Sequence, residues 1–448
     1  MKDNNTDISI MPLSEEWWNL LSDKWKKIFL FNISVKHSNK ENYLVDIKKY
    51  SIKDFQINPE YDISDVLNSI LKLEKFYVED DDIFYDCEER LSPLLQLKNL
   101  KSLKIDNNKC DLSPLASLPN LSSLELPYNS ADVSALSDLK GLRYLNLENN
   151  KQKLDFLNNL TNLEVLNLNG LIFFATNEGN TQDLSPLSGL KKLHSLYLKG
   201  NKSDIKPLSN LKNLRKLDLS YANIDLSPLS ELTNLKELSL SHNLFGKGNT
   251  QDLSFLHNLK NLEQLNLDGN KADINPVSSL VNLTELSLNF NKQKLTPLSS
   301  LKKLKKLYLK YNESNLEPIA GLTGLEVLYL DFNKKEIKPL AKLKNLRLLD
   351  LNFTESDLDP VAHLTNLEVL ILGCVDTDLS FLTGLPKLKT LILSRIDSDL
   401  SPLANLIGLQ ELYISDATVG IKSIEPLIDI IKANGGKVII SNNKHQRA

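Results

Sequence analysis

The sequence predicts a solenoid of the α/β class, in which short parallel strands stack on one face and short helical turns on the other. Three observations support this fold. The pattern Leu-x-x-Leu-x-x-Leu-x-Leu, with Ile at the last position in some copies, recurs fifteen times in the 448 residues. The spacing is 21 residues except for intervals of 30 after Leu160 and 27 after Leu232. A Ser-Pro-Leu motif or a close variant lies between many successive copies.

The second half of each copy predicts a strand. In the copy that begins at Leu211, residues 216–220 alternate polar and apolar side chains, so the leucines face one side and the polar residues the other. One strand per coil is therefore expected. A degenerate copy at Ile70, Leu73, Phe76 and Val78 predicts one further coil, and a weaker copy at Leu44, Ile47, Tyr50 and Ile52 another.

Asparagine recurs at two positions of the repeat. The first lies just before the second leucine and holds Asn in nine copies and Gly in three, among them Asn213 and Gly324. Because both residue types tolerate a positive φ, we expect a tight turn there. The second position lies three residues after the last leucine, and its asparagines are expected to form a buried ladder that bonds the bending backbone. This ladder ends after Asn333, so the last four coils are expected to be less well tied.

The return leg of each coil carries the proline motif, as at 113–115 and 227–229. Serine suits the cap of a helical turn, and proline presets φ where no donor is needed. Because few residues remain per coil, a single turn of 3₁₀-like helix is expected.

These elements resemble leucine-rich repeat proteins, and among them the short-repeat class of bacterial internalins and phosphatase-regulating repeat proteins. The stretch 283–291, Leu-Thr-Glu-Leu-Ser-Leu-Asn-Phe-Asn, and the Pro-Leu turn carry the resemblance, which covers roughly residues 65–420. It implies an arc with a concave parallel sheet and 3₁₀-like turns on the convex side. It also implies binding of proteins, without naming a partner.

The two ends of the solenoid are expected to be covered. Ser14 is placed to cap a helix with one apolar face, formed by Trp17, Leu21, Trp25, Ile28 and Phe29. Residues 424–432 predict a second helix, followed by a strand at 438–440. We therefore expect a helical cap at 1–42, a solenoid at 43–420, and a helix-strand cap with a polar tail at 421–448. A partner-binding role is the alternative for the first helix.

Three insertions interrupt the repeats. The two long intervals contain the same sequence, Gly-Asn-Thr-Gln-Asp-Leu-Ser, at 179–185 and 248–254. This identity indicates either a binding loop or duplication of a block of repeats. The third insertion, 80–89, is strongly acidic but lacks the spacing of a calcium loop, so a solvated loop is expected.

Composition narrows the function classes. The net charge is −4, and residues 1–90 carry 12 Lys and Arg against 19 Asp and Glu, which argues against a nucleic-acid partner. Three widely spaced cysteines indicate reduced thiols rather than a disulfide framework. The chain start carries no apolar export segment, and no stretch is long enough for a membrane span, so a cytoplasmic location is expected.

The sequence offers no recognisable catalytic chemistry. A phosphate loop, a His-Glu-x-x-His motif and a Cys-x-x-Cys pair are all missing, and the six histidines are far apart. We therefore expect no enzyme activity, no cofactor and no metal.

The candidate site is an aromatic to aliphatic surface on the concave face. Mid-strand positions and the position before the ladder asparagine bring apolar residues together over several consecutive coils, which favours a protein interface. Ordinary edge stacking within the repeat is the alternative. The candidate residues are Phe290, Tyr308, Tyr311, Tyr329, Phe332, Asp350, Phe353 and Ile371, with Val369 beside them.

The sequence thus favours a non-enzymatic protein-binding scaffold or regulator with an unidentified protein partner and an undetermined oligomeric state. The alternative is a secreted or surface-associated adhesin, similar to internalins, that engages a host or neighbouring cell. Fractionation of the source cells distinguishes these two functions.

Overall fold

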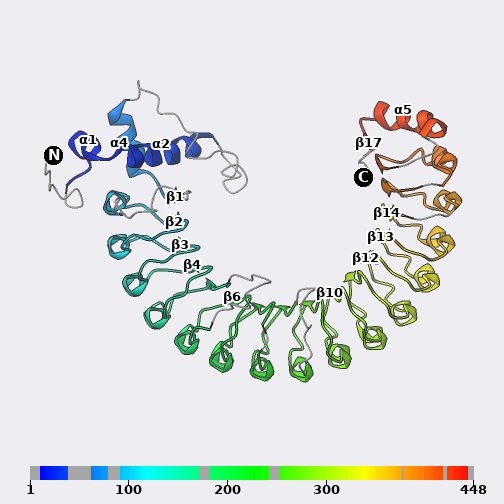
Figure 1. The fold of residues 1–448 in the computed structure, drawn as a ribbon, viewed down its shortest axis with the longest axis horizontal. Coiled ribbons are helices and arrows are strands. Elements are labelled where there is room, and N and C mark those ends of the chain that lie inside the picture. The colour runs from blue at the N-terminus through cyan, green and yellow to red at the C-terminus, as the bar shows by residue number, and fades with distance from the viewer. Residues whose placement is uncertain are drawn as a thin grey trace, which may run out of the picture. The chain divides into compact units, whose positions relative to one another are not determined.

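The computed structural model describes residues 11–38, 62–78, 91–170, 181–222, 224–241, 252–374, 378–396, 398–416 and 421–441. The chain divides into two compact units, residues 1–218 and 219–448. Within each unit the coils stack with their strands along one side and their helical turns along the other (Figure 1). The weak copy at Leu44 and all three insertion loops lie wholly or mostly outside the described residues.

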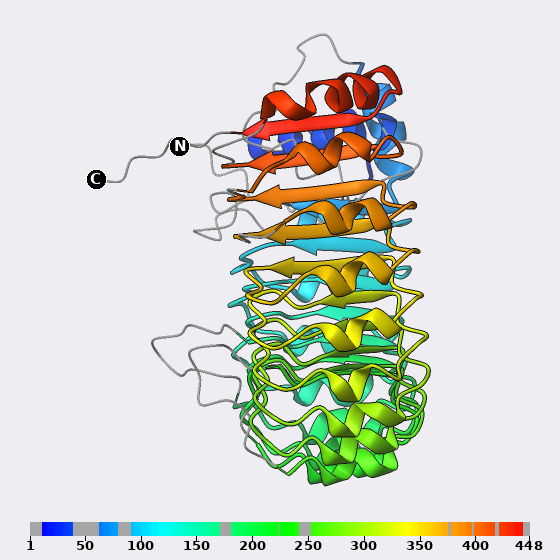
Figure 2. The same ribbon diagram turned by 90° about the vertical axis from the view of Figure 1, so that its right-hand side faces the viewer.

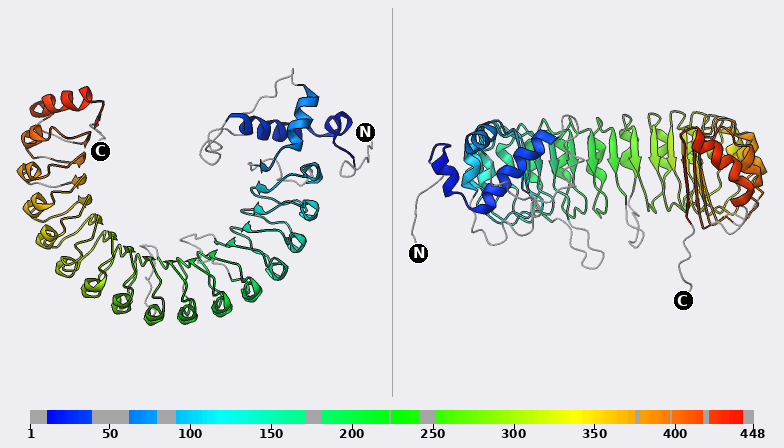
Figure 3. Two further views of the ribbon diagram at one scale, coloured as in Figure 1. Left: turned by 180° about the vertical axis from the view of Figure 1, so that it is seen from behind. Right: turned by 90° about the horizontal axis from the view of Figure 1, so that it is seen from above.

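The strands of each unit are parallel to one another. Unit 1 contains β1 (Lys75–Val78), β2 (Ser102–Ile105), β3 (Ser123–Glu125), β4 (Tyr144–Asn146), β5 (Val165–Asn167), β6 (Ser195–Tyr197) and β7 (Lys216–Asp218). Unit 2 contains β8 (Glu237–Ser239), β9 (Gln264–Asn266), β10 (Glu285–Ser287), β11 (Lys306–Tyr308), β12 (Val327–Tyr329), β13 (Leu348–Asn352), β14 (Val369–Gly373), β15 (Thr390–Ser394), β16 (Glu411–Ser415) and β17 (Lys437–Ser441). In each unit a strand pairs with the strand of the next coil, as the side-by-side arrows in Figure 3 show.

Each return leg is a short 3₁₀ helix, as predicted. In unit 1 these are η3 (Ser92–Gln96), η4 (Ser113–Ser117), η5 (Ser134–Asp138), η6 (Asp155–Asn159), η7 (Ser185–Gly189) and η8 (Lys206–Asn210). In unit 2 they are η9 (Ser227–Glu231), η10 (Ser254–Asn258), η11 (Asn275–Ser279), η12 (Thr296–Ser300), η13 (Glu317–Ile319), η14 (Lys338–Lys342), η15 (Asp359–His363), η16 (Ser380–Gly384), η17 (Ser401–Asn405) and η18 (Ile421–Ile424).

The hydrophobic core lies between the strands and the 3₁₀ helices. Almost all of the repeat leucines are inaccessible to solvent. Each strand leucine is in register with the leucine of the next coil, as Leu286 is with Leu307. The 21-residue period therefore keeps one continuous layer of leucine in each unit, and the alternate side chains of each strand stay on the open face.

The asparagine ladder is confirmed. Asn291 is buried, its Nδ2 donates to the carbonyl of Gln293 at 2.9 Å, and its Oδ1 accepts from the Gln293 N–H at 3.2 Å. Asn270 makes the same two bonds to Ala272. Each side chain thus satisfies backbone groups that the bend leaves without a strand partner.

The tight turn predicted before the second leucine is confirmed, since the Leu214 N–H donates to the Leu211 carbonyl at 2.9 Å. The positive φ from which the turn was argued is wrong. None of Asn99, Asn213 and Gly324 has a positive φ. Instead, asparagines in this column donate Nδ2 to a carbonyl of the preceding coil, as Asn213 does to Lys191 at 2.8 Å. Where asparagine occupies this column, it acts as a donor between coils. The left-handed residues lie one position before the ladder asparagine, as at Tyr128 with a φ of 58°.

The cap of the 3₁₀ helix also differs from the prediction. Ser227 is the first residue of η9 and accepts no capping bond; its N–H donates to Asp225 Oδ1 at 2.9 Å and its hydroxyl donates to Asp225 Oδ2 at 2.8 Å. The same pairing recurs at Asp252 and Ser254. These bonds lower the pKa of each aspartate, because they stabilise its ionised form.

The coils beyond the ladder are tied in a different way. Strands β13 to β16 are five residues long, whereas the strands of β8 to β12 have three residues. The two extra residues at the end of each long strand also pair, as Asn352 does with Gly373. In the coils with a ladder asparagine, the equivalent residues lie beyond the end of the strand. Longer pairing between strands therefore takes the place of the asparagine ladder in these coils. The prediction that the last four coils are less well tied did not include this pairing.

The N-terminal region contains α1 (Glu15–Leu20), α2 (Asp23–Ser38) and α4 (Ile63–Leu71). Ser14 caps α1, as predicted, but the expected single helix is two helices, because α1 ends at Leu20 and the Ser22 hydroxyl accepts from the Trp25 N–H at 3.3 Å at the start of α2. The predicted apolar face is nevertheless buried, and Phe29 packs against Phe76 of β1 with ring centroids 5.2 Å apart.

The helix and strand predicted at the C-terminal end are confirmed. Helix α5 (Glu425–Ala433) has proline in its first turn and is followed by β17, which pairs in parallel with β16 (Figure 2). The glycine turn between them is required, because a Cβ at Gly436 would lie 2.3 Å from the carbonyl oxygen of Gln410. Strand β17 leaves Ile439 43% and Ile440 37% exposed.

Candidate protein-binding surface

The mid-strand tyrosines of β11 and β12 form the first part of the candidate surface. Tyr308 and Tyr329 are in register on adjacent strands, with their side chains on the face opposite the leucine core. Their rings are stacked, with centroids 5.1 Å apart and planes 13° from parallel. Both side chains are half-buried, so the stack keeps part of its aromatic surface exposed to solvent.

A longer aromatic column follows the strands, at the position before the ladder asparagine. Phe290 stacks on Tyr311 at 4.7 Å, Tyr311 on Phe332 at 4.3 Å, and Phe332 on Phe353 at 4.2 Å. The planes of the last three rings are within 7° of parallel. Tyr311 is 41% exposed and the others are half-buried, so the structure brings together the aromatic residues predicted from the sequence.

The backbone explains why these rings align. Phe290, Tyr311, Phe332 and Phe353 all have φ between 53° and 59°, in the left-handed region that bulky side chains rarely occupy. In this conformation the Phe332 N–H still donates to the Asn352 carbonyl at 2.8 Å, so bonding between coils continues while the chain leaves the strand. Gly269 fills the same position with a φ of 71°, without the strain that a side chain adds.

Charged residues flank the aromatic columns. Lys310 Nζ lies 3.1 Å from Asp331 Oδ2 and 5.7 Å from the centroid of Tyr329. Lys306 Nζ lies 3.2 Å from Glu285 Oε2, and this hydrogen bond raises the pKa of Lys306. Burial, followed by the nearby Glu285 carboxylate, raises the pKa of Tyr308. The rings are therefore surrounded by a charged rim of both signs.

Asp350 differs from the other candidate residues. It lies in register between Tyr329 and Ile371, but it is only 4% exposed. Burial raises the pKa of its carboxyl, and the Asn352 N–H, which donates to Asp350 Oδ1 at 3.1 Å, opposes that shift. Ile371 and the neighbouring Val369 are half-buried and extend the apolar surface beyond the rings.

A ladder of alternating charges, which the sequence reasoning missed, lies just before the strands of unit 2. Lys305 pairs with Glu326 at 2.7 Å, Arg347 with Glu368 at 2.7 Å, and Lys389 with Glu368 at 3.0 Å. Arg347 and Lys389 together lower the pKa of Glu368 to about 2. The signal in the sequence is a change of charge sign every 21 residues.

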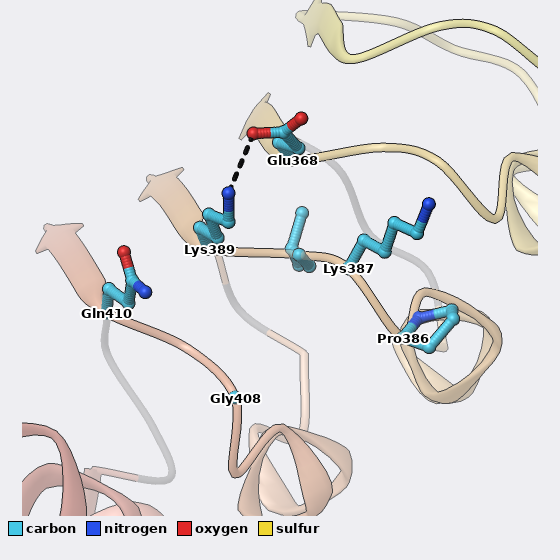
Figure 4. A pocket seen from close by; sticks show the side chains of 7 residues that line it. Glu368, Pro386, Lys387, Lys389, Gly408 and Gln410 are labelled. Carbon is cyan, nitrogen blue, oxygen red and sulfur yellow. Dashed lines mark hydrogen bonds and ion pairs between the residues drawn. The ribbon is translucent and has the colours of Figure 1, made fainter.

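Two shallow cavities lie along this ladder. One of about 490 Å³ is lined by Lys305, Glu326, Arg347 and Glu368 together with polar residues of the turns. The other, of about 280 Å³, lies between Glu368, Lys389 and Gln410 (Figure 4). The acids of both cavities are paired with bases. Lys387 also lines both cavities and donates to Asn366 Oδ1 at 2.7 Å, so each cavity has one more base than acid among its lining residues.

No three His, Cys, Asp or Glu side chains gather into a possible metal site within the described ranges. Helices long and apolar enough to cross a membrane are likewise missing from the part of the chain that the structure describes.

Comparisons with known proteins agree with this geometry. No protein-family model matches the chain, and no curated protein matches it. Among solved structures, an internalin of Listeria monocytogenes is similar, with 28% identity, a TM-score of 0.50, and a match over 71% of this chain and 87% of the internalin. The chain is a leucine-rich repeat protein. Its parallel sheet and regularly spaced 3₁₀ turns form an open leucine-rich repeat solenoid.

Two further structures share the fold of this leucine-rich repeat protein. A leucine-rich repeat protein of Leptospira interrogans is 22% identical, with a TM-score of 0.62 over 86% of this chain and all of that one. TLR13 in its complex with ssRNA13 is 21% identical, with a TM-score of 0.55; the match covers 79% of this chain and 57% of TLR13. At these identities the likeness concerns the fold alone.

Proposed function

We propose that this leucine-rich repeat protein is a non-enzymatic scaffold or regulator that binds a protein partner on the open face of its sheet. The observation that carries the proposal is the pair of stacked aromatic columns in unit 2, with Tyr308 and Tyr329 beside the longer column from Phe290 to Phe353. Aromatic side chains dominate the binding energy of many protein interfaces, so their concentration here supports a docking point at these columns.

The rigidity of the columns supports tight binding. Each inner ring is held between two neighbours, as Phe332 is between Tyr311 and Phe353, and its backbone is fixed in the left-handed region. Little side-chain freedom is therefore left to lose when a partner docks. The rim pairs Lys310 with Asp331 and Lys306 with Glu285 supply polar contacts around the apolar centre, as protein interfaces require.

The proposed contact surface consists of the six rings together with Ile371. Asp350 is assigned a supporting role in the same surface, because its burial removes it from direct contact while it bonds the Asn352 backbone. This division predicts that Asp350→Asn weakens binding less than loss of a ring does.

Two compartments are compatible with a scaffold of this kind. The exposed free thiol of Cys374 supports the cytoplasm, where thiols stay reduced. The similarity to an internalin supports the alternative, a secreted or surface-associated adhesin. Fractionation of the source cells, with detection of the protein by antibody, separates the two: recovery in the cytoplasmic fraction supports the regulator, and recovery in the medium or on the surface supports the adhesin.

The experiment that tests the binding surface begins with affinity capture of a partner from the source organism. The variant Tyr308→Ala/Tyr329→Ala/Phe332→Ala is then titrated against that partner, with a loss of at least ~2 kcal/mol of binding free energy expected for each ring that contacts it.

A matched control is available in Tyr128→Ala. Tyr128 has the same left-handed backbone position and is 46% exposed, but it belongs to unit 1 and is not part of the columns. A polar control is Asn167→Ala/Ser239→Ala, which truncates the positions in β5 and β8 that correspond to Tyr308 in β11. If either control reduces affinity as much as the aromatic variant does, or if the aromatic variant binds normally, the surface proposed here is wrong.

A further inference from the structure

The last strand of unit 2 has an open edge. Strand β17 pairs with β16 on one side, and the described residues of unit 2 place no strand on its other side. The Lys437 N–H donates to the Gln410 carbonyl at 2.9 Å, and the Ser441 carbonyl accepts from the Asp416 N–H at 2.9 Å, so these residues direct their groups to β16. Because the direction alternates along a strand, the N–H and C=O of Val438 and Ile440 point to the open edge.

The three central side chains of β17, Val438, Ile439 and Ile440, are apolar. Ile439 is in register with Tyr413 on the open face of the sheet and is 43% exposed, while Ile440 is in register with Ile414 on the core side and is 37% exposed. Helix α5, which packs against β17, adds Ile430, also exposed. An exposed apolar strand with free backbone groups is a template for pairing with another strand.

The first strand of unit 1 is treated differently. The outward N–H of Tyr77 in β1 donates to Asn32 Oδ1 at 2.8 Å, and the Tyr77 carbonyl accepts from Asn32 Nδ2 at 2.9 Å. A buried side chain of α2 therefore occupies the groups that an added strand would need. This closure opposes head-to-tail pairing of β17 with β1 of a second molecule, which would build an open chain of copies.

We propose that β17 is a self-association edge, at which two copies of this protein pair as antiparallel strands about a two-fold axis. With Ile439 opposite the same residue of the second copy, Val438 of each copy lies opposite Ile440 of the other. Both residues direct their free groups outward, so each such pair exchanges two hydrogen bonds. The register is self-complementary, and it covers the exposed Ile439 side chains with each other.

Sedimentation of the full chain over a range of concentrations tests this proposal. The expected result is a reversible shift from one chain to two. Ile439→Lys places like charges opposite each other at the axis and is expected to weaken the association by at least roughly tenfold. Ile407→Lys is the matched control, because Ile407 is 68% exposed in the turn before β16 and away from the edge; it is expected to dimerise normally.

Two further measurements keep the test independent of misfolding. An equal mixture of Ile439→Lys and Ile439→Glu is expected to recover a dimer that neither variant forms alone. Hydrogen exchange at the amides of Val438 and Ile440 is expected to slow as the protein concentration rises, whereas the amide of Ile439, which points to β16, stays unchanged.

A wild-type chain that remains a monomer at its highest soluble concentration overturns the proposal. So does a dimer that Ile439→Lys leaves intact, because that result places the contact elsewhere. Protection of Val438 and Ile440 only upon addition of a different protein would assign the edge to a strand of that partner instead.

Discussion

Asn32 and Tyr77 form a reciprocal pair of hydrogen bonds in which a side-chain amide takes the place of a neighbouring strand. Asn32 Nδ2 also donates to the Ile28 carbonyl at 2.9 Å, so the amide is fixed within its own helix. Since Asn32 is buried, no water is available to replace these bonds if the side chain is removed.

We therefore expect Asn32→Ala to lower the free energy of unfolding by on the order of 2–4 kcal/mol, because two backbone groups of Tyr77 lose their partner in a buried site. Urea denaturation measures this loss. The control is Asn99→Ala, which removes one exposed bond to the Leu71 carbonyl and is expected to cost less than about 1 kcal/mol. Equal losses in the two variants would contradict the assignment of Asn32 as the closure of β1.

The ladder makes a second prediction. Asn291→Ala removes both bonds to the Gln293 backbone and is expected to cost on the order of 1–3 kcal/mol. Thr354→Ala, one coil beyond the end of the ladder, is expected to cost less, because the buried Thr354 hydroxyl has no hydrogen-bond partner. Urea melts that show equal costs would argue against a stabilising ladder.

The left-handed aromatic column predicts an inverted preference between glycine and alanine. At Phe332 both substitutions remove the stacked ring, but only alanine keeps the strain of a side chain at a φ of 57°. Phe332→Gly is therefore expected to be more stable than Phe332→Ala by about 1 kcal/mol.

Tyr329 is the control for this comparison, since it lies within β12, where glycine is expected to be less stable than alanine by about 0.5–1 kcal/mol. Thermal or urea melts of the four variants give the answer. If glycine is also the less stable substitution at Phe332, backbone strain does not limit stability there.

The aspartates that cap the 3₁₀ helices predict a dependence of stability on pH. The pKa of Asp225 is lowered in the folded chain from a value of 3.8, chiefly by its backbone bond with Ser227. Because the folded pKa is the lower one, the contribution is fully present above the unfolded value of 3.8 and is lost as the pH falls through the folded value. The equivalent aspartates 111, 132, 183, 252, 378 and 399 shift in the same direction.

Asp225→Asn is therefore expected to flatten the loss of stability below pH 3.8 while it lowers stability at neutral pH. Unfolding midpoints measured across the acid range check this prediction. Ser227→Ala serves as a second variant, because it removes the hydroxyl bond but keeps the backbone N–H, so a smaller change in the same direction is expected. An unaltered pH profile in both variants would rule out the caps as its source.

Particular residues show where sequence reasoning succeeds and where it fails. Asn291 was assignable to a buried ladder because its place in the repeat dictates its surroundings. Asn213 was placed in a turn, which the structure confirms, but its bond to the Lys191 carbonyl was not predicted, because that bond depends on a residue of the preceding coil. Likewise, Trp17 and Trp25 were predicted to share one apolar face, but the break at Ser22 depends on a hydroxyl bond that periodicity does not encode.

The sequence by itself determined the coils, the leucine core, the ladder and the aromatic positions, because a fixed 21-residue period forces equivalent residues into register on adjacent strands. The tertiary structure decided which of those residues reach the surface. Asp350 shares its column with Tyr308 and Tyr329 but is buried, since its exposure depends on the side chains beside it. It also decided that α2 occupies the edge of β1, whereas no strand in the described part of unit 2 covers the outer edge of β17, since edge closure depends on contacts between segments far apart in the chain.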